Sequence, residues 1–320
     1  MQNQVLTVKD LKTHFPSGRT WLGKQTYIKA VDGVSLHINE NEIVGLVGES
    51  GSGKTTLGRS ILRLTGSKQG EIIFKGQDIL KLNGKSLRKI RKDIQLIFQD
   101  PYASLSPRLQ IKKIIAEPLL LHNIVPREMV DQRISELLKE VGLENYFKDR
   151  YPHEMSGGQR QRIAIARVLA LQPQLIIADE PVSALDVSVT SQILNLLKEI
   201  QKKNGLSMLF ISHDLNVIRH MADRILVMYA GQIVEEGATK QLINAPLHPY
   251  TKLLIASMPG FKNRNKRRAI KEHKVAFKLQ NAETGCPFIA RCSEAQSLCK
   301  QSNPHLKESK GNRFVACHFN

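Results

Sequence analysis

Short apolar runs alternate with amphipathic segments along most of the chain. Four runs are rich in Ile, Val and Leu at nearly every position, at residues 42–47, 175–179, 208–212 and 225–229. Continuous apolar runs of this length are typical of strands covered on both faces of a parallel sheet. Two earlier runs, 5–8 and 34–38, alternate more, which predicts a smaller antiparallel part. The pattern therefore indicates an α/β fold with a mostly parallel sheet.

Between residues 104 and 148 the apolar spacing becomes helical, and we place a helical insertion at about 104–170. One apolar face repeats at three- and four-residue steps, through Val130, Ile134, Leu137, Leu138 and Val141. Beyond Pro259 the composition turns basic and polar, and then rich in cysteine. We therefore predict a main domain at 1–258 and a C-terminal extension at 259–320.

Composition limits where the protein works. No apolar run reaches the 18 or so residues that a membrane-spanning helix needs. The N-terminus has no apolar leader, so we expect the chain to fold in the cytoplasm. The net charge of +18 suits nucleic acid, an anionic membrane surface or nucleotide phosphates. Part of it lies in the basic run 262–274, which fits a solvated linker or a segment that contacts lipid headgroups or an acidic partner.

A phosphate-binding loop follows the apolar run 42–47. It fits the P-loop pattern and continues into a helical pattern from Lys54 onward; its residues are Gly48, Glu49, Ser50, Gly51, Ser52, Gly53, Lys54, Thr55 and the adjoining Thr56. Glycines let backbone N–H groups wrap a phosphate at a helix N-terminus. Lys54 adds positive charge over the β- and γ-phosphates, and the Thr55 hydroxyl is suited to ligating Mg²⁺.

An acidic pair ends the apolar run 175–179. Asp179 lies at its C-terminal end, where open α/β sheets bind ligands, and is placed to support the Mg²⁺ shell. Glu180 follows at once and is suited to orienting or deprotonating a water aimed at the γ-phosphate. An acidic pair alone is commonly a helix cap or a surface feature, but downstream of a P-loop it predicts a nucleotide hydrolase.

A third motif lies between these two, at residues 155–162. It resembles the signature motif of ABC-type ATPases, and its nucleotide-facing residues are Ser156, Gly157, Gly158 and Gln159. Ser156 is suited to capping the helix that follows, and the two glycines clear its N-terminus for a phosphate. In that family two ATPase domains pair head-to-tail. The resemblance thus implies that each signature motif contacts the ATP held by the partner's P-loop.

The remaining elements of the family are present in the same order. Gln99 resembles the Q-loop glutamine that joins the Mg²⁺ site to the helical insertion, and Asp186 ends a segment that resembles the D-loop. His213 resembles the switch histidine that contacts the γ-phosphate. An aromatic residue near the N-terminus should stack on adenine, and Phe15 occupies the expected place, with Tyr27 the alternative. The resemblance covers about residues 5 to 240 and implies an active ATP hydrolase.

Two further stretches resemble one branch of that family, the importers of dipeptides, oligopeptides and nickel. They are the segment 99–108 after the Q-loop glutamine and the His-Pro-Tyr element beginning at His248. Importers of this branch generally combine two different ATPase subunits, two membrane permeases and an extracytoplasmic binding protein. The resemblance implies a peripheral location at the cytoplasmic face of the membrane and no nucleic-acid partner.

All four cysteines lie in the C-terminal extension, at Cys286, Cys292, Cys299 and Cys317. A cytoplasmic location disfavours disulfides, so a metal site is the better explanation. The spacing matches neither common zinc ribbons nor simple ferredoxins, and four thiolates suit Zn²⁺ or an iron–sulfur cluster, with free thiols the remaining alternative. ATPases of the branch can carry a 4Fe–4S cluster on such a tail, and the resemblance favours that cofactor beside ATP and Mg²⁺.

Two rival functions remain within the ABC class. An ATPase acting on nucleic acid or ribosomes would suit the basic charge. Repair members, however, carry coiled-coil or zinc insertions, and translation factors carry two ATPase domains in tandem; neither feature is present in the sequence. An exporter subunit would leave the His-Pro-Tyr element unexplained. We therefore predict the ATP-hydrolysing subunit of an importer for short peptides or a related small solute.

Overall fold

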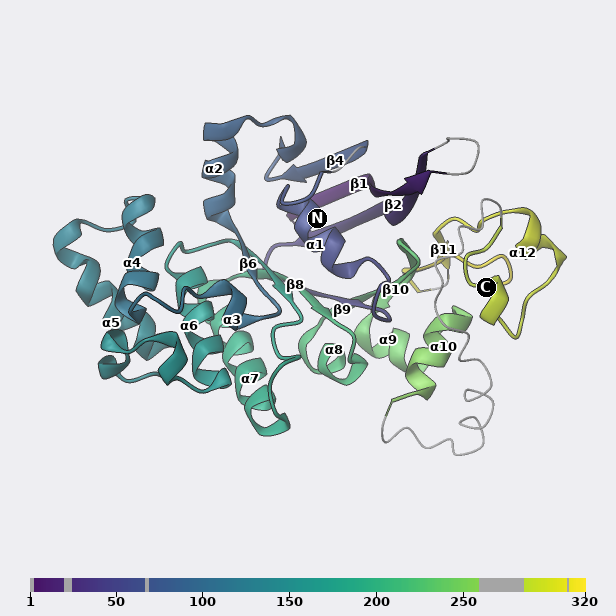
Figure 1. Cartoon of the computed structure of the whole chain (residues 1–320). Helices are drawn as coiled ribbons and strands as arrows, with labels where there is room; N and C mark the ends of the chain where they lie inside the picture. Colours follow the sequence, from purple (N-terminus) through teal and green to yellow (C-terminus); the bar gives the residue numbers. More distant parts are fainter. Residues whose placement is uncertain (1–2, 20–24, 67–68, 259–284, 310) are drawn as a thin grey trace. The chain divides into compact units, whose positions relative to one another are not determined.

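The computed structural model describes residues 3–19, 25–66, 69–258, 285–309 and 311–320 (Figure 1). These residues form two compact units, which are described one at a time. The first unit comprises residues 1–5, 39–42 and 81–210, and the second comprises 6–38, 43–80 and 211–320. The basic run 262–274 lies outside the described residues.

The first unit contains strands β6 to β8 and helices α2 to α7. The strands lie in the order β8-β7-β6 and span Ser207–Ser212 (β8, whose last two residues belong to the second unit), Leu175–Asp179 (β7) and Ile94–Ile97 (β6). Strands β6 and β7 pair in parallel. The run at β7 was predicted as a buried strand of a parallel sheet, whereas β6 was not among the predicted strands. The helices span Gly84–Asp93 (α2), Pro101–Ser104 (α3), Ile111–Leu121 (α4), Val130–Glu140 (α5), Gly157–Leu169 (α6) and Val187–Asn204 (α7).

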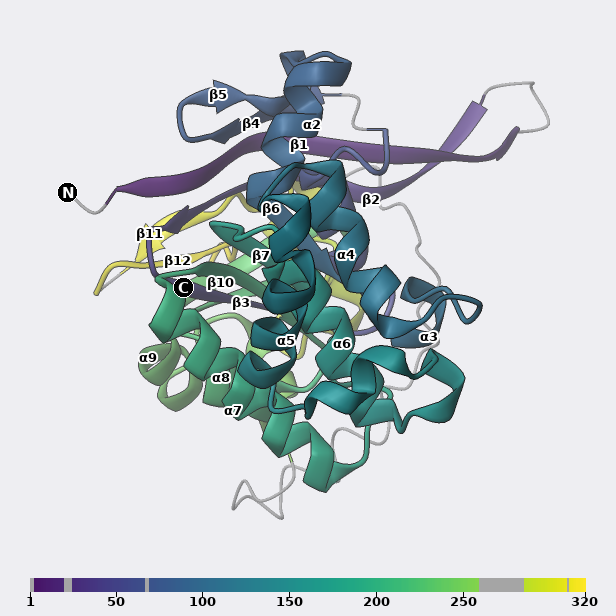
Figure 2. The ribbon, with the colours of Figure 1, turned by 90° about the vertical axis from the view of Figure 1, so that its left-hand side faces the viewer.

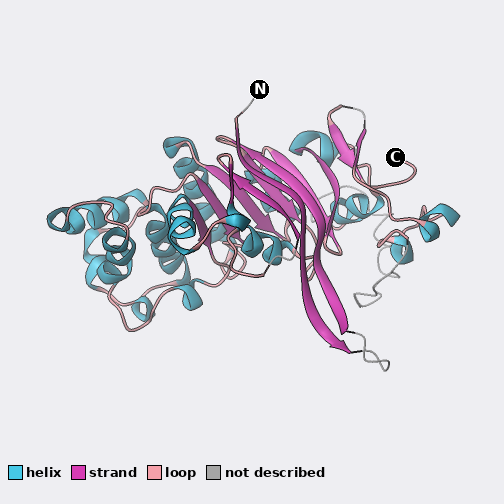
Figure 3. Cartoon of the chain, turned by 90° about the horizontal axis from the view of Figure 1, so that it is seen from above, coloured by secondary structure: helices cyan, strands magenta, loops and turns pink. Residues whose placement is uncertain are grey.

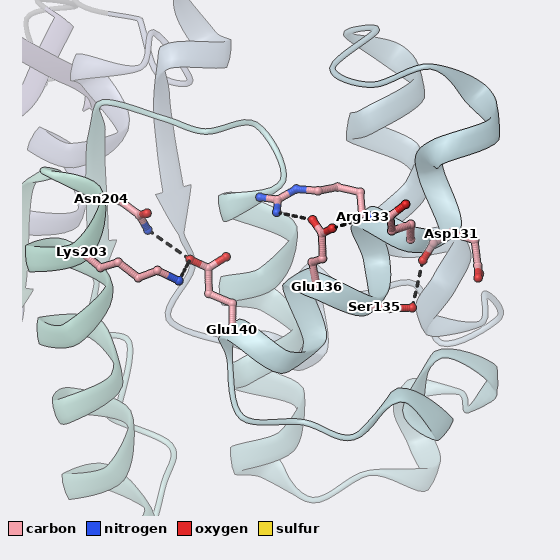
Figure 4. A network of polar contacts seen from close by, with 8 residues as sticks. Asp131, Arg133, Ser135, Glu136, Glu140, Lys203 and Asn204 are labelled. Atoms are coloured by element: carbon pink, nitrogen blue, oxygen red, sulfur yellow. Dashed lines mark hydrogen bonds and ion pairs between the residues drawn. The ribbon is translucent and has the colours of Figure 1, made fainter.

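Helices α4, α5 and α6 pack against one another, and α6 also packs against α7 and β6 (Figure 2). The apolar face predicted for α5 is the face that packs, because Ile134, Leu137 and Leu138 are buried. Its polar face carries charged contacts (Figure 4). There Arg133 donates to Glu136, and Lys203 of α7 donates to Glu140.

The second unit holds two sets of strands. The antiparallel set has the order β2-β1-β4-β5, with bounds Gln25–Asn39, Gln4–Arg19, Gln69–Phe74 and Gln77–Asp78. The other set has the order β11-β12-β10-β9-β3, with bounds Lys307–Ser309, Arg313–Val315, Gln232–Ala238, Arg224–Tyr229 and Ile43–Val47. Strand β3 pairs with β9 in parallel, and β10 pairs with β9 in the antiparallel sense.

The helices of the second unit are short. They span Lys54–Ile61 (α1), Leu215–Met221 (α8), Thr239–Asn244 (α9), Pro249–Ala256 (α10) and Ser297–Gln301 (α12). Short 3₁₀ turns in the two units span Ile79–Lys81, Arg127–Met129, Asn145–Asp149, Pro152–Glu154 and Ile289–Arg291.

The C-terminal segment joins the second unit through its strands. Strand β12 pairs with β10, Glu235 lying opposite Val315, and β11 pairs with β12 (Figure 1). Residues 285–320 thus extend the same set of strands that contains β3. This pairing was not predicted from the sequence, because β11 and β12 are only three residues long each.

The antiparallel strands are longer than their apolar patterns predict. Strands β1 and β2 run side by side for most of their length (Figure 3). The sequence indicated residues 5–8 and 34–38 alone, whereas β1 spans Gln4–Arg19 and β2 spans Gln25–Asn39. The outer parts of both strands are largely exposed and polar, so backbone pairing and not an apolar pattern defines them.

Candidate functional site

The P-loop lies in the second unit, between β3 and α1. Gly53 precedes the helix with φ 106° and ψ 1°, a left-handed conformation that favours glycine. The buried ammonium of Lys54 donates to the backbone carbonyls of Gly48, at 2.8 Å, and Glu49, at 2.9 Å. The lysine is thereby held inside the loop, at the N-terminus of α1, where backbone N–H groups attract anions.

Two glycines of the loop are required by close packing. A Cβ on Gly53 would lie 2.0 Å from the backbone oxygen of Ala30, and one on Gly48 would lie 2.2 Å from that of Met228. Both contacts are with backbone, so no side-chain movement relieves them. The neighbouring strands β2 and β9 therefore restrict the shape of the loop.

The other residues predicted for nucleotide binding in this unit lie at strand positions or ends. Phe15 of β1 and Tyr27 of β2 are exposed to nearly the same extent, 38% and 37%. The structure therefore offers both rings and does not separate the two candidates for adenine stacking. His213 is exposed directly after β8, and Asp214 caps α8 by accepting from the backbone N–H of Asn216 at 2.8 Å.

In the first unit the acidic pair ends β7. Asp179 is 2% exposed, and Glu180 adopts φ 47°, a left-handed conformation that is costly for a residue with a side chain. The side-chain amide of Gln99 donates a hydrogen bond to the Glu180 carboxylate at 3.0 Å. The structure thus brings together the Q-loop glutamine and the predicted catalytic carboxylate, which are 81 residues apart.

The signature motif begins α6. Ser156 accepts from the backbone N–H of Gln159 at 3.3 Å, and the Gln159 side chain accepts from the backbone N–H of Ser156 at 2.9 Å. This reciprocal cap is the arrangement predicted for Ser156, with Gln159 completing it. It leaves the N–H groups of Gly157 and Gly158 at the start of a helix, where a phosphate binds favourably.

The D-loop segment packs directly on the two signature glycines. A Cβ on Gly157 would lie 3.3 Å from Leu185, and one on Gly158 would lie 2.5 Å from Val189. Asp186 caps α7 by accepting from the backbone N–H of Val189 at 2.9 Å. This hydrogen bond, together with a smaller contribution from the Ser188 hydroxyl, holds the pKa of Asp186 below its usual value. The capping carboxylate is therefore ionised at neutral pH.

The segment after the Q-loop glutamine contains a contact that the sequence did not reveal. Asp100 caps α3 by accepting from the backbone N–H of Tyr102 at 2.8 Å. The Tyr102 ring lies 3.8 Å from the guanidinium carbon of Arg160, which belongs to the signature helix. A cation–π contact of this kind modestly stabilises the packing of Tyr102 on Arg160. Tyr102, in the segment 99–108 that resembles one branch of the family, therefore contacts the signature helix.

The His-Pro-Tyr element also contacts the nucleotide loop. Nδ1 of His248 accepts from the backbone N–H of Tyr250 at 3.0 Å and caps α10. The Tyr250 hydroxyl then accepts from the backbone N–H of Glu49, within the P-loop, at 2.8 Å. The sequence singled out this element through its resemblance to one branch of the family but gave Tyr250 no contact, because its partner lies 201 residues away.

Burial keeps His248 neutral. It is 2% exposed, and burial, with Lys252 as a smaller contribution, lowers its pKa to about 4. The backbone N–H groups of Leu247 and His248 donate to the buried carboxylate of Glu235, at 2.9 and 2.8 Å. The start of α10 is therefore tied to β10 as well as to the P-loop.

The four cysteines of the C-terminal segment line one small pocket together with His248 and Phe288. Within residues 285–320, apart from 310, and the other described ranges, no group of three or more His, Cys, Asp or Glu side chains is placed to hold a metal ion. Burial raises the pKa of Cys286 and of Cys292, so both thiols are protonated at neutral pH. The expected metal site is therefore not formed as a ligating cluster, although the four thiols face the same space.

Comparison with known proteins agrees with these motifs. Residues 31–183 match the ABC transporter family model, and residues 234–299 match the C-terminal region of oligopeptide/dipeptide transporters. The chain is 48% identical to the oligopeptide transport ATP-binding protein AppF of Bacillus subtilis, over 99% of this chain and 98% of that protein. It is 43% identical to the dipeptide transport ATP-binding protein DppF of Escherichia coli, over 99% and 95% of the two chains.

A solved structure shares the fold. The ATP-binding cassette MJ0796, in a dimeric post-hydrolysis state bound to ADP and Pi, superposes with a TM-score of 0.65 at 33% identity. The match covers 73% of this chain and 98% of that one. Among the described residues, no helix has the length and apolar character needed to cross a bilayer.

The P-loop, the capped signature helix and the Gln99–Glu180 pair, together with these matches, define an ABC-type ATPase. The chain belongs to the ABC transporter family of ATP-binding proteins. Within it, the match from 234 to 299 and the full-length relatives place the chain in the oligopeptide/dipeptide transporter branch.

Proposed function

We propose that this chain is the ATP-hydrolysing subunit of an importer for dipeptides, oligopeptides or a closely related small solute. The observation that carries the proposal is the C-terminal region matched to oligopeptide/dipeptide transporters, joined to a complete set of ABC ATPase motifs. Relatives named for transport of these solutes match nearly the whole chain. In the chain itself, Tyr250 of that region contacts the P-loop.

The proposed cycle needs two such ATPase subunits, paired head-to-tail. The P-loop holds ATP and Phe15 stacks on adenine. Thr55, Gln99 and Asp179 are the residues that would hold Mg²⁺, which would offset the charge of the phosphates. His213 contacts the γ-phosphate, Asp186 bridges the two sites, and the signature motif from Ser156 to Gln159 contacts the partner's ATP. ATP binding closes the pair, and hydrolysis reopens it.

Glu180 orients and deprotonates the attacking water in this cycle. Two observations support that role. Its backbone is held in a costly left-handed conformation, as residues at catalytic sites often are. Its carboxylate also accepts from Gln99, so nucleotide-dependent movement of the Q-loop would release or capture it. Gln99 thereby links the hydrolytic carboxylate to the helices of the first unit.

We propose that a short helix of a permease subunit docks on those helices. A pocket lies beside the Q-loop, between β6, α4 and α6, and its lining includes Phe98, Pro118, Leu121 and Val168. Phe98 is 41% and Leu121 56% exposed, an apolar surface suited to a membrane partner that ends in a cytoplasmic helix. Leu121→Arg should abolish membrane recovery while ATP affinity stays unchanged, whereas Met129→Arg, at an exposed residue that does not line the pocket, should not.

The remaining partners and the domain limits are proposed on the same basis. A second, different ATPase subunit, two permeases and an extracytoplasmic binding protein complete the importer, and this chain lies peripherally at the cytoplasmic face. Residues 1–258 form the ATPase domain, with the helical insertion at about 104–170, and 259–320 form a basic linker and a cysteine-rich extension.

The cysteine-rich extension is proposed to bind a 4Fe–4S cluster. The donor set supports this, because Cys286, Cys292, Cys299 and Cys317 all line one pocket. Binding would have to displace the protons of the thiols, whose pKa is raised at Cys286 and Cys292, and draw the side chains together. Iron and zinc content of the chain purified without oxygen tests the proposal. Iron that is lost in Cys292→Ser supports it; stoichiometric zinc, or no metal, contradicts it.

Uptake of a radiolabelled tripeptide tests the function as a whole. Cells that lack their own copy of this subunit are complemented with the wild-type chain, with Lys54→Ala or with Lys240→Ala, an exposed lysine of α9 that serves as the control. We expect uptake with the wild type and the control, and none with Lys54→Ala. Equal uptake by all three strains, or by the strain without the chain, would contradict the proposed function.

A further inference from the structure

An arginine of the cysteine-rich segment reaches into the nucleotide loop. Arg291 lies between Cys286 and Cys292, and its two terminal nitrogens donate to the two carboxylate oxygens of Glu49 at 2.7 and 2.8 Å. The pair is bidentate and partly shielded, with side-chain exposures of 20% for Arg291 and 36% for Glu49. Bidentate hydrogen bonds between a guanidinium and a carboxylate are stronger than hydrogen bonds between neutral groups.

Glu49 is held through its backbone as well. Its N–H donates to the Tyr250 hydroxyl at 2.8 Å. Its carbonyl accepts from the ammonium of Lys54 at 2.9 Å and from the backbone N–H of Ser52 at 3.1 Å. One residue of the loop is thus fixed by its side chain, its N–H and its carbonyl. Because Lys54 bonds the same peptide, the position of Glu49 bears directly on the lysine that contacts phosphate.

Phe288, three residues before Arg291, packs against two aromatic rings and thereby positions Arg291. Phe288 is 1% exposed, and its ring lies 5.2 Å from that of Tyr229, edge-on, and 5.5 Å from that of Tyr250. The guanidinium carbon of Arg291 lies 5.7 Å from the Phe288 ring and 5.9 Å from the Tyr229 ring. A guanidinium stays protonated in proteins, so Arg291 supplies a fixed positive charge beside Glu49.

The charges of this pair have a consequence for ATP. Glu49 is the first residue after Gly48, so a carboxylate lies at the rim of a loop whose ligand carries several negative charges. Unpaired, it would repel the triphosphate; paired with Arg291, its charge is cancelled close to its source.

We propose that Arg291 neutralises Glu49 at the nucleotide site and thereby raises the affinity of the P-loop for the triphosphate. The cysteine-rich segment therefore contributes to ATP affinity, and any change that displaces Phe288 or Arg291 weakens it. This role rests on ATP binding by the P-loop and does not depend on the transported solute.

A charge-swap series on the full chain tests this role. Affinity for the Mg²⁺ complex of adenylyl imidodiphosphate is measured at low and high salt for Arg291→Gln, Arg291→Lys, Glu49→Gln and the double variant Glu49→Gln/Arg291→Gln. We expect Arg291→Gln to weaken binding by about 3- to 10-fold at low salt and by less at high salt. Arg291→Lys should recover part of the loss. The double variant should lie within about 2-fold of the wild type, because no uncompensated carboxylate remains.

The control is Lys300→Gln, which removes one positive charge from an exposed position of α12 in the same segment. It should bind like the wild type. A double variant no better than Arg291→Gln, or an unchanged affinity in Arg291→Gln, would overturn the role, since a contact that only anchors the segment cannot be rescued by removing Glu49. If Arg291→Gln does not fold, Glu49→Gln decides: it removes a negative charge and leaves the Arg291 cation near the triphosphate, so tighter binding is expected, and unchanged or weaker binding contradicts the role. Failure of the wild type to bind would contradict the ATP site itself.

Discussion

The amide of Gln99 donates a hydrogen bond to the carboxylate of Glu180 at 3.0 Å, and Glu180 is held at φ 47°. The two residues come from separate segments, one just after β6 and one at the end of β7, which pair in parallel. The carboxyl ends of both strands therefore lie at the same edge, and the Q-loop glutamine meets the carboxylate there. This arrangement supports the proposed catalytic role of Glu180.

Glu180→Gln should separate ATP binding from ATP hydrolysis. The amide preserves size and polarity but does not accept a proton, so we expect hydrolysis to fall by about 100-fold or more while nucleotide affinity changes little. Phosphate release and nucleotide binding by the purified pair of ATPase subunits measure the two effects. Glu199→Gln, at an exposed position of α7, is the matched control. Equal hydrolysis by Glu180→Gln, with no other competent site present, would remove Glu180 from the mechanism.

Gly53→Ala should disrupt the P-loop. The added Cβ would lie 2.0 Å from the carbonyl oxygen of Ala30, and φ is 106°. We expect a loss of about 3 kcal/mol or more in unfolding free energy together with loss of ATP binding. Gly76→Ala is the control: its φ is 77° and nothing lies within 4 Å of the new Cβ, so it should cost about 1 kcal/mol. Denaturant unfolding measures the loss of unfolding free energy in both variants. Equal losses would mean that the backbone strain of a positive φ, and not the contact with Ala30, determines the cost.

Gly158→Ala should be rescued by a smaller neighbour. The new Cβ would lie 2.5 Å from Cγ1 of Val189, so we expect overpacking to cost about 1–3 kcal/mol. Val189→Ala in the same chain removes that atom and should restore most of the stability. Val187→Ala, at a residue 86% exposed, should restore none. A double variant with Val189→Ala that is no more stable than Gly158→Ala would show that the D-loop does not pack on the signature helix in this way.

The stability of the chain should depend on pH through His248. Burial lowers its folded pKa to about 4 from an unfolded value of 6.5, so below pH 6.5 the unfolded chain binds a proton that the folded chain does not. The contribution to the free energy of unfolding is complete above pH 6.5 and is lost as the pH falls toward 4, by about 3 kcal/mol at most. His248→Asn retains a helix-capping side chain and should lose this dependence. His305→Asn, at an exposed residue, should retain it; parallel pH curves for all three chains would contradict the assignment.

Local chemistry made much of the nucleotide loop predictable. The P-loop pattern requires glycines before a helix, and the predicted helix start at Lys54 and the buried strand before it are both observed. The cap formed by Ser156 was predictable for the same reason, because its partner Gln159 lies three residues away. The parallel strands were predictable because burial on both faces requires apolar side chains at every position.

Contacts between distant segments could not be predicted in this way. Tyr250 and Arg291 contact Glu49 across 201 and 242 residues. The His-Pro-Tyr element marked Tyr250 but not its contact with the P-loop, and no local pattern marked Arg291. The same holds for Arg160, which stacks on Tyr102. The pairing of β12 with β10 depends on backbone hydrogen bonds in strands too short to carry a pattern. The structure also does not decide which of Phe15 and Tyr27 stacks on adenine, because the two rings are nearly equally exposed on neighbouring strands.

Identifying the proteins that assemble with this chain is the most direct test of whether it belongs to a peptide importer. The chain is tagged at its native level, the membranes are solubilised gently, and the co-purifying proteins are identified. We expect two multispanning membrane proteins, a second ABC ATPase and an extracytoplasmic peptide-binding protein, and we expect Leu121→Arg to lose the membrane proteins. Recovery of nucleic acid or ribosomes without any membrane partner would contradict the importer and leave only the ATPase.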